Sequence, residues 1–192
     1  MEGYSHVDNK GILLEKKIDN LFGSKENGFF IELGANDGLF QSNTAFLEKS
    51  RKWKGILIEP SIKGYELCKK NRINSICLNY ACVSNNYKKD YIEGDFLNNN
   101  PMASIDGTRL SNNTDIQSVK AMTLEKILDI HLDGNYIDFL SLDTEGYELN
   151  ILHGLNLDKY RPKYILVEIY SKDYINIVNF LQSKGYNLQS NF

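Results

Sequence analysis

The sequence predicts an α/β fold with a mostly parallel central sheet and helices on both of its faces. Short apolar runs alternate along the chain with longer amphipathic segments, which is typical of strands joined by crossover helices. The chain has 192 residues, of which 42% are hydrophobic, enough for one compact core and too few for two. We therefore expect one domain over residues 1–192.

Several of the expected elements are bounded by residues that start or end such elements. Pro60 ends the second strand, and Ser61 follows it as a candidate helix N-cap. Thr123 is the candidate N-cap of a later helix, and Gly185 follows the last helix, where glycine readily reaches the left-handed conformation. The first half of the chain is expected to begin with a helix over residues 10–22. A strand over 29–33, a helix over 43–50, a strand over 55–59, a helix over 61–72 and a strand over 75–83 are expected to follow in this order. The second half is expected to contain an edge strand over 85–92, a helix over 123–131, strands over 136–142 and 163–168, and helices over 145–153 and 173–184.

Composition excludes several classes of protein. The net charge is −3, so the chain lacks the positive field by which nucleic-acid binders attract a polyanion. No run approaches the roughly 20 apolar residues of a membrane span, and the N-terminus lacks the order of a signal peptide, so we expect a cytoplasmic protein without membrane contact. Cys68, Cys77 and Cys82 have no metal-type spacing and are expected to be buried, reduced thiols.

Polar and glycine residues follow the first two expected strands directly. Gly34 and Gly38 bracket a tight turn that lets backbone N–H groups approach a ligand. Glu59 ends the second strand about twenty residues further on, where an acid accepts hydrogen bonds from both ribose hydroxyls of an adenosine. Because ligands of such sheets lie at the carboxyl ends of the strands, the sequence predicts an adenosine-containing ligand there.

The side chains of this turn favour one adenosine ligand over another. Asn36 stands where a dinucleotide-binding turn needs its second glycine for close approach to the pyrophosphate. Glu32 and Asp37 would repel a pyrophosphate, whereas they suit the amino group and the sulfonium of S-adenosylmethionine. The electrostatics therefore favour the methyl donor over NAD.

The motifs of the chain together resemble the FkbM family of methyltransferases over almost its whole length. They lie at residues 30–38 (FIELGANDG), 42–44 (SNT), 47–48 (LE), 53–60 (WKGILIEP), 143–148 (DTEGYE) and 153–154 (HG). The resemblance implies a Rossmann-like class I methyltransferase fold and S-adenosylmethionine as donor. It also implies O-methylation of a small molecule or glycan, most typically a sugar.

The resemblance also implies which residues hold the donor. The methionine half would lie against Glu32, Gly34, Ala35, Asn36 and Gly38. Nearby or along the rest of the donor would lie Ser42, Asn43, Thr44, Glu59, Pro60, Ser61, Ala81, Cys82 and Asp143. Two alternatives stay open, since residues 42–44 are equally good helix caps and residues 81–82 equally good strand residues.

A neutral alcohol has to lose a proton when it is methylated, so a base is expected near the donor. Asp143, Glu145 and Glu168 fall at or just after the ends of expected strands, and His153 is the other candidate base. An acid-rich helix N-terminus is the alternative explanation for Asp143 and Glu145. A divalent metal such as Mg²⁺ on Asp143 and Glu168 is a further option, although no complete ligand set is identifiable.

Residues 94–119 form the longest irregular stretch and are expected to be an insertion or lid over the acceptor, with disorder as the alternative. The lid side chains would be Met102, Ile105, Arg109 and Leu110. The C-terminal hairpin that usually completes this fold is expected to be short or incomplete, because residues 185–192 leave room for one strand. An uncovered sheet edge would favour a homodimer.

Two other functions remain open at this point. An NAD-linked oxidoreductase is disfavoured by Asn36 and by the lack of a Tyr-x-x-x-Lys pair. A catalytically silent cofactor-binding module would keep the glycine turn and lose the acids after the fourth strand, yet these acids are present.

Overall fold

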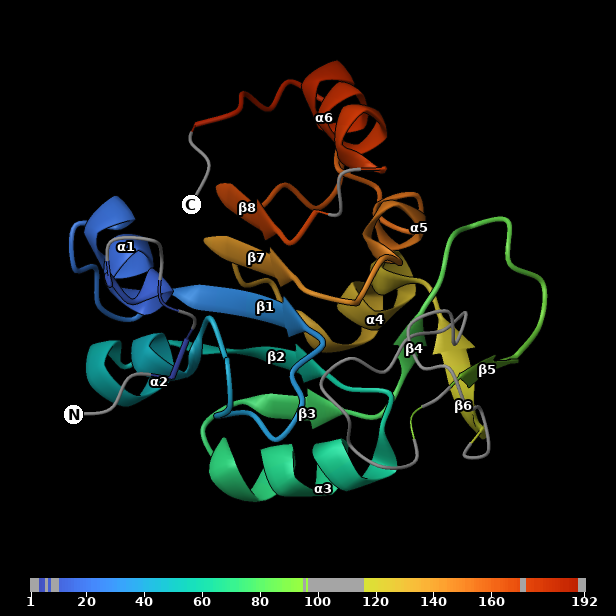
Figure 1. The fold of residues 1–192 in the computed structure, drawn as a ribbon, viewed down its shortest axis with the longest axis horizontal. Helices are drawn as coiled ribbons and strands as arrows, with labels where there is room; N and C mark the ends of the chain where they lie inside the picture. Colours follow the sequence, from blue (N-terminus) through green and yellow to red (C-terminus); the bar gives the residue numbers. More distant parts are fainter. Residues whose placement is uncertain are drawn as a thin grey trace.

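The computed structural model describes residues 4–5, 7, 11–94, 96, 116–169 and 172–189. A five-stranded parallel sheet in the order β3-β2-β1-β7-β8 forms the centre, and a three-stranded sheet in the order β4-β6-β5 lies beside it (Figure 1). The central strands are β1 (Phe29–Leu33), β2 (Lys54–Ile58), β3 (Ile76–Leu78), β7 (Phe139–Leu142) and β8 (Tyr164–Val167). The α/β fold with a parallel sheet is therefore confirmed.

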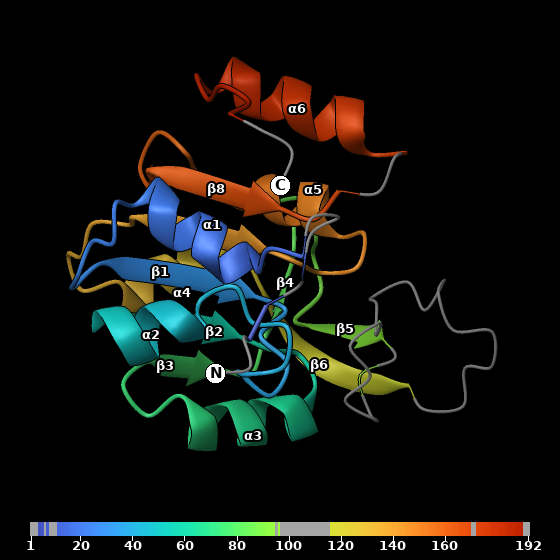
Figure 2. The same cartoon turned by 60° about the vertical axis from the view of Figure 1, so that its left-hand side comes forward.

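Helices cover both faces of the central sheet (Figures 1 and 2). The side chains of a strand alternate between its two faces, so Ile31 and Leu33 enter one core cluster and Phe30 enters the other. The cluster around Phe30 contains residues of α1 (Leu14–Leu21), α2 (Ala45–Arg51) and α3 (Ile62–Asn71). The cluster around Ile31 contains residues of α4 (Leu124–His131), α5 (Glu148–Leu152) and α6 (Tyr174–Ser183).

The single strand expected over residues 75–83 is wrong, because the chain leaves the central sheet after Leu78. The Asn79 side-chain amide donates to the backbone carbonyls of Glu59 and Pro60, both at 2.9 Å, which turns the chain away from β2. Residues beyond this turn join the smaller sheet, whose strands are β4 (Ala81–Cys82), β5 (Tyr91–Gly94) and β6 (Gln117–Met122). The edge strand expected over 85–92 accordingly lies later, as β5, and pairs antiparallel with β6.

Several other boundaries differ from the expected ones: the helix expected over 10–22 spans Leu14–Leu21, and the strand expected over 136–142 begins at Phe139. The helix expected over 145–153 begins only at Glu148, because Glu145 and Gly146 have φ of 59° and 100°, outside the right-handed helical region. Residues 186–189 form no strand, so within the described residues the central sheet ends at β8. The four candidate lid side chains at positions 102, 105, 109 and 110 lie outside the described residues.

The predicted helix caps agree with the structure. The Ser61 hydroxyl accepts from the Gly64 N–H and the Thr123 hydroxyl from the Lys126 N–H, each at 3.3 Å. Gly185 has a φ of +78° directly after the last helix. No helix in the described ranges is both long and apolar enough to cross a membrane.

Candidate functional site

Three acidic residues follow three strands of the central sheet at the same edge, with β1 and its glycine turn between the first and the other two. Glu59 follows β2, Asp143 follows β7 and Glu168 follows β8. The backbone N–H of each donates to the carbonyl of the last residue of the adjacent strand, at 3.0, 3.2 and 2.9 Å respectively. The ladder of the sheet therefore continues through these residues and fixes them at the carboxyl edge, where ligands of such sheets bind.

The glycine turn after β1 packs directly against the end of β7. Gly34 and Gly38 have φ of +78° and +81°, which L side chains rarely adopt. A Cβ on Gly34 would stand 1.8 Å from the backbone carbonyl oxygen of Asp143. A Cβ on Gly38 would stand 2.7 Å from the Arg72 side chain and 3.0 Å from the Cys68 sulfur. Both positions therefore require glycine, and the turn lies beside the acidic edge.

Glu59 joins this turn to the start of α3. One carboxylate oxygen accepts from the Asn36 N–H and the other from the Ser61 N–H, both at 2.7 Å. Burial raises the pKa of Glu59 to about 7, although these two hydrogen bonds act in the opposite direction. A carboxylate offers about four acceptor positions, so two remain for the two hydroxyls of a ribose.

Glu32 is buried and fully engaged with the segment that leads into α2. Its carboxylate accepts from the hydroxyls of Ser42 and Thr44 and from the Asn43 N–H at 2.8 Å. The Ser42 hydroxyl in turn accepts from the Ala45 N–H, the first of the helix, at 3.0 Å. The Ser42 hydroxyl thus satisfies an N–H at the start of α2, although the N-cap residue itself is Thr44, whose side chain makes no capping hydrogen bond. Glu32 orders residues 42–44 around the turn. A direct contact of Glu32 with a donor stays a prediction.

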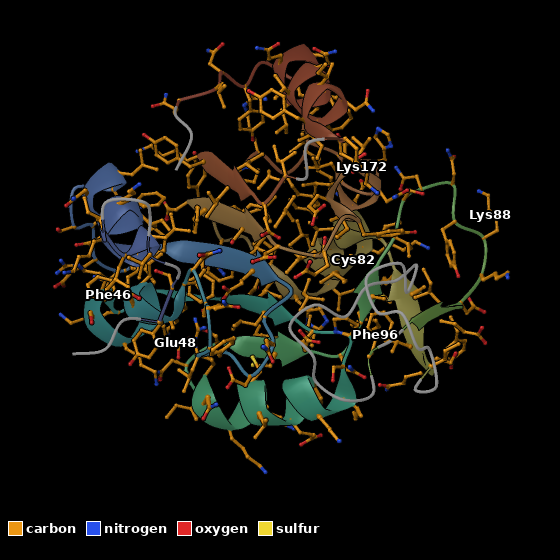
Figure 3. All side chains as sticks on the ribbon, in the orientation of Figure 1. Phe46, Glu48, Cys82, Lys88, Phe96 and Lys172 are labelled. Atoms are coloured by element: carbon orange, nitrogen blue, oxygen red, sulfur yellow. The ribbon has the colours of Figure 1, made fainter. Side chains whose placement is uncertain are left out.

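Arg72, which sequence reasoning missed, ties the turn to α2 and α3. Its guanidinium is fully buried and donates to the Gly38 carbonyl at 2.9 Å and to Thr44 at 2.8 Å. It also pairs at 2.8 Å with Glu48, a buried residue of α2 (Figure 3), and lies 3.5 Å from Glu32. An arginine at the end of an amphipathic helix looks like an ordinary surface residue, so the sequence around Arg72 gives no sign that its side chain is buried against the glycine turn.

Two buried amide oxygens in this region have no hydrogen-bond partner among the described residues, namely Oδ1 of Asn36 and of Asn43. A buried acceptor without a donor is costly, so these atoms suit a ligand that donates. The ammonium group of an amino acid such as methionine is a donor with three protons. The residues of the turn therefore fit the methionine half of S-adenosylmethionine, and Glu59 fits its ribose.

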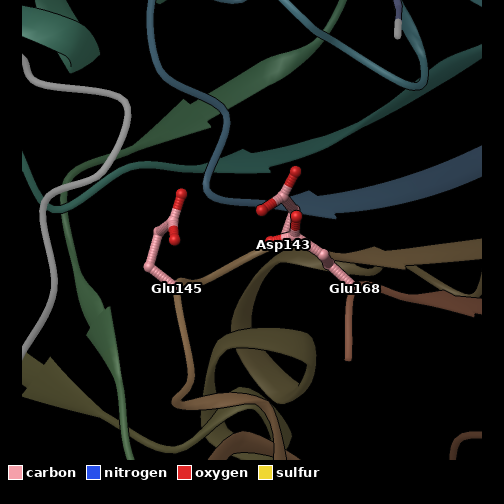
Figure 4. A group of neighbouring side chains, drawn as sticks. All are labelled: Asp143, Glu145 and Glu168. Atoms are coloured by element: carbon pink, nitrogen blue, oxygen red, sulfur yellow. The ribbon is translucent and has the colours of Figure 1, made fainter. Parts of the chain in front are cut away.

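The carboxyl groups of Asp143 and Glu168 lie together at the strand ends, and Glu145 reaches toward them from the following loop (Figure 4). One oxygen from each of the three acids lies within 4.8 Å of the others. Burial and then the neighbouring Glu168 carboxyl raise the pKa of Asp143 to about 8. At neutral pH this pair consequently retains a proton, as two close carboxyls do, and the cluster could instead take an oxygen-binding cation.

Glu148, a second residue that sequence reasoning missed, fixes the loop that carries Glu145. Its buried carboxylate accepts from the backbone N–H groups of Thr144 and Gly146, at 2.8 and 3.1 Å. These bonds hold Glu145 in its left-handed conformation. The acid-rich helix N-terminus therefore begins at Glu148, and it does not account for Asp143 or Glu145.

The other predicted site residues lie apart from the acidic cluster. The exposed His153 ring packs on the Phe180 ring of α6, with the centroids 5.0 Å apart, because it follows the far end of α5. Ala81 and Cys82 are buried in β4, beyond the turn at Asn79, and Pro60 accepts from that residue. Contact of these residues and of Ser61 with adenine stays a prediction.

Comparison with known proteins agrees with this geometry. The model of the methyltransferase FkbM domain matches residues 32–188, a span that includes the glycine turn and every strand of the central sheet except the first few residues of β1. Searches of curated proteins and of solved structures find no significant match. Because the match extends over most of the chain, this protein belongs to the FkbM family and is an S-adenosylmethionine-dependent methyltransferase.

Proposed function

We propose that the protein transfers a methyl group to a hydroxyl of a small molecule, and that this molecule is a sugar or glycan. The observation that supports the proposal is the Asp143 and Glu168 pair, which stands at the carboxyl edge beside the glycine turn. When bound, S-adenosylmethionine supplies a methyl group that is already activated by its positively charged sulfur. What the protein adds is placement and a proton acceptor.

Glu168 is the base in this proposal and Asp143 is its positioning partner. The raised pKa of Asp143 keeps that carboxyl protonated at neutral pH, so the proton of the pair stays on the more buried residue. Glu168 is the more exposed of the two, so in this proposal it is the member that meets the acceptor and takes the hydroxyl proton. Base catalysis of this kind contributes typically about 10²–10⁴-fold to a rate.

A sugar suits this edge because it presents several neighbouring hydroxyl donors. Three carboxyl groups within 4.8 Å offer acceptors for more than one of these hydroxyls, so that one hydroxyl is oriented while another reacts. We propose that the transfer proceeds without a metal ion, since the proton of the pair already offsets part of the negative charge of the cluster.

A screen with isotopically labelled S-adenosylmethionine tests the proposal on a panel of sugars, phenols and amines. We expect label in sugars as a methyl ether, identified by NMR, and full activity in the presence of EDTA. Glu168→Gln should lower the single-turnover rate by roughly 100-fold or more while donor affinity stays unchanged. The exposed Glu66 on α3 provides the matched control, and Glu66→Gln should behave as wild type.

Three outcomes would count against the proposal. Transfer to amines alone would contradict the acceptor class, loss of activity in EDTA would replace the metal-free route with a metal-bound acceptor, and an unchanged rate for Glu168→Gln would remove this residue as the base.

A further inference from the structure

Two cysteine sulfurs lie in contact beneath the glycine turn. The Sγ atoms of Cys68 in α3 and Cys77 in β3 are 3.4 Å apart, within hydrogen-bond distance. Cys68 is buried, whereas Cys77 is only half-buried and is therefore the more exposed member of the pair. Cys82 is buried in β4 and belongs to the smaller sheet.

The pair is chemically asymmetric. A hydrogen bond from the Cys68 thiol lowers the pKa of Cys77, and the positive charge of Arg72 acts in the same direction against the effect of burial. The pKa of Cys68 is raised, first by its hydrogen bond to Cys77 and then by burial. A half-buried cysteine with a lowered pKa, beside a cysteine with a raised one, is the arrangement found in cysteines that react with oxidants.

Cys68 also touches the part of the chain that binds the donor. The position of a Cβ on Gly38 is only 3.0 Å from the Cys68 sulfur, so this sulfur packs directly under the turn. One helical turn further along α3, Arg72 holds the Gly38 carbonyl at 2.9 Å. A displacement of Cys68 would therefore reach the turn both directly and through Arg72.

We propose that Cys68 and Cys77 are an oxidative modification site, at which a peroxide closes a reversible disulfide that weakens donor binding. The Cys77 thiolate attacks one peroxide oxygen, which gives a sulfenic acid and releases hydroxide. The Cys68 sulfur then attacks the Cys77 sulfur, a disulfide forms, and the sulfenic oxygen leaves as water with the Cys68 proton. In total the two thiols lose two electrons and two protons, and hydrogen peroxide becomes two molecules of water.

The expected loss of donor affinity follows from the length of the sulfur–sulfur bond. A disulfide holds its sulfurs at about 2.05 Å, so the pair has to close by roughly 1.3 Å from its present distance. The Gly38 carbonyl is anchored to a buried arginine that also pairs with Glu48, so the turn has little freedom to follow. The inference rests on the assignment of the turn to the donor.

The experiment compares the reduced chain with the same chain after hydrogen peroxide, by peptide mass mapping and by titration with S-adenosylhomocysteine. We expect a cross-link between the tryptic peptides 64–69 and 73–88, with the loss of two hydrogens, and an affinity about fivefold or more lower that dithiothreitol restores. The second peptide contains both Cys77 and Cys82, so Cys82→Ser distinguishes them. That variant should still cross-link, whereas Cys68→Ser and Cys77→Ser should not cross-link and should keep their affinity after peroxide.

Formation of the disulfide and its effect on donor binding are tested separately. Absence of the cross-link overturns the modification site, and a cross-linked chain of unchanged affinity overturns its effect on the donor. A reduced chain that does not bind S-adenosylhomocysteine would contradict the assignment of the turn, and with it the second part, while the mass map still decides the first.

Discussion

Replacement of Glu59 by glutamine is expected to weaken the binding of S-adenosylmethionine by roughly 10- to 100-fold, since hydrogen bonds to a charged group contribute about 1.5–3 kcal/mol. The carboxylate already accepts from the turn and from α3 at 2.7 Å, so its remaining acceptors are aimed by the fold. Glutamine keeps the shape and one acceptor oxygen and loses the charge. Isothermal titration measures the change, with Glu66→Gln as the control of equal charge change.

The same titration should depend on pH in a defined direction. In the predicted contact, ribose hydroxyls would donate to the Glu59 carboxylate. The raised pKa of Glu59, about 7, leaves this group largely protonated at pH 6 in the unliganded protein. Affinity should accordingly rise between pH 6 and pH 8 in the wild type, and this part of the rise should be absent from Glu59→Gln. Equal affinities and equal pH slopes for the two proteins would show that Glu59 does not bind the donor.

Replacement of Gly34 by alanine should be the most destabilising single change in the turn, on the order of 4 kcal/mol or more in the free energy of unfolding. A Cβ there meets the Asp143 backbone oxygen at 1.8 Å, and the two residues directly follow β1 and β7, which hydrogen-bond to each other. Relief would require β1 and β7 to separate. Urea unfolding, followed by the fluorescence of the buried Trp53, measures the effect.

Gly134 offers a control that separates the clash from the backbone conformation. Its φ of +71° is close to that of Gly34, but a Cβ there would meet no atom within 4 Å. Gly134→Ala should therefore cost only the left-handed conformation, about 1–2 kcal/mol. Similar losses at the two positions would mean that the turn does not pack on β7 as described.

Local patterns were enough to predict which residues stand at the carboxyl edge of the central sheet. The apolar runs gave the central strands, and glycine or acidic residues just after them marked the carboxyl edge because parallel strands all end there. The helix caps at Ser61 and Thr123 were also predictable, because a cap depends only on residues within one helical turn.

Contacts between residues distant in sequence were not predictable in this way. Residues 75–83 are mostly apolar and resemble one strand, yet the strand ends before Asn79, whose side chain donates to the carbonyls of Glu59 and Pro60 after β2. Arg72 is buried because Glu48 and the turn surround it, and Cys68 meets Cys77 only once α3 packs on the sheet. The left-handed Glu145 likewise depends on Glu148, which receives the N–H groups around it.

Titration of the wild-type chain with S-adenosylmethionine, S-adenosylhomocysteine and NAD, each in a separate calorimetric experiment, tests the central claim that the turn and Glu59 form a methyl-donor site. We predict saturable one-to-one binding of the first two compounds and none of NAD, because Asn36 occupies the position where a pyrophosphate would need glycine. Binding of NAD alone, or of none of the three, would contradict it.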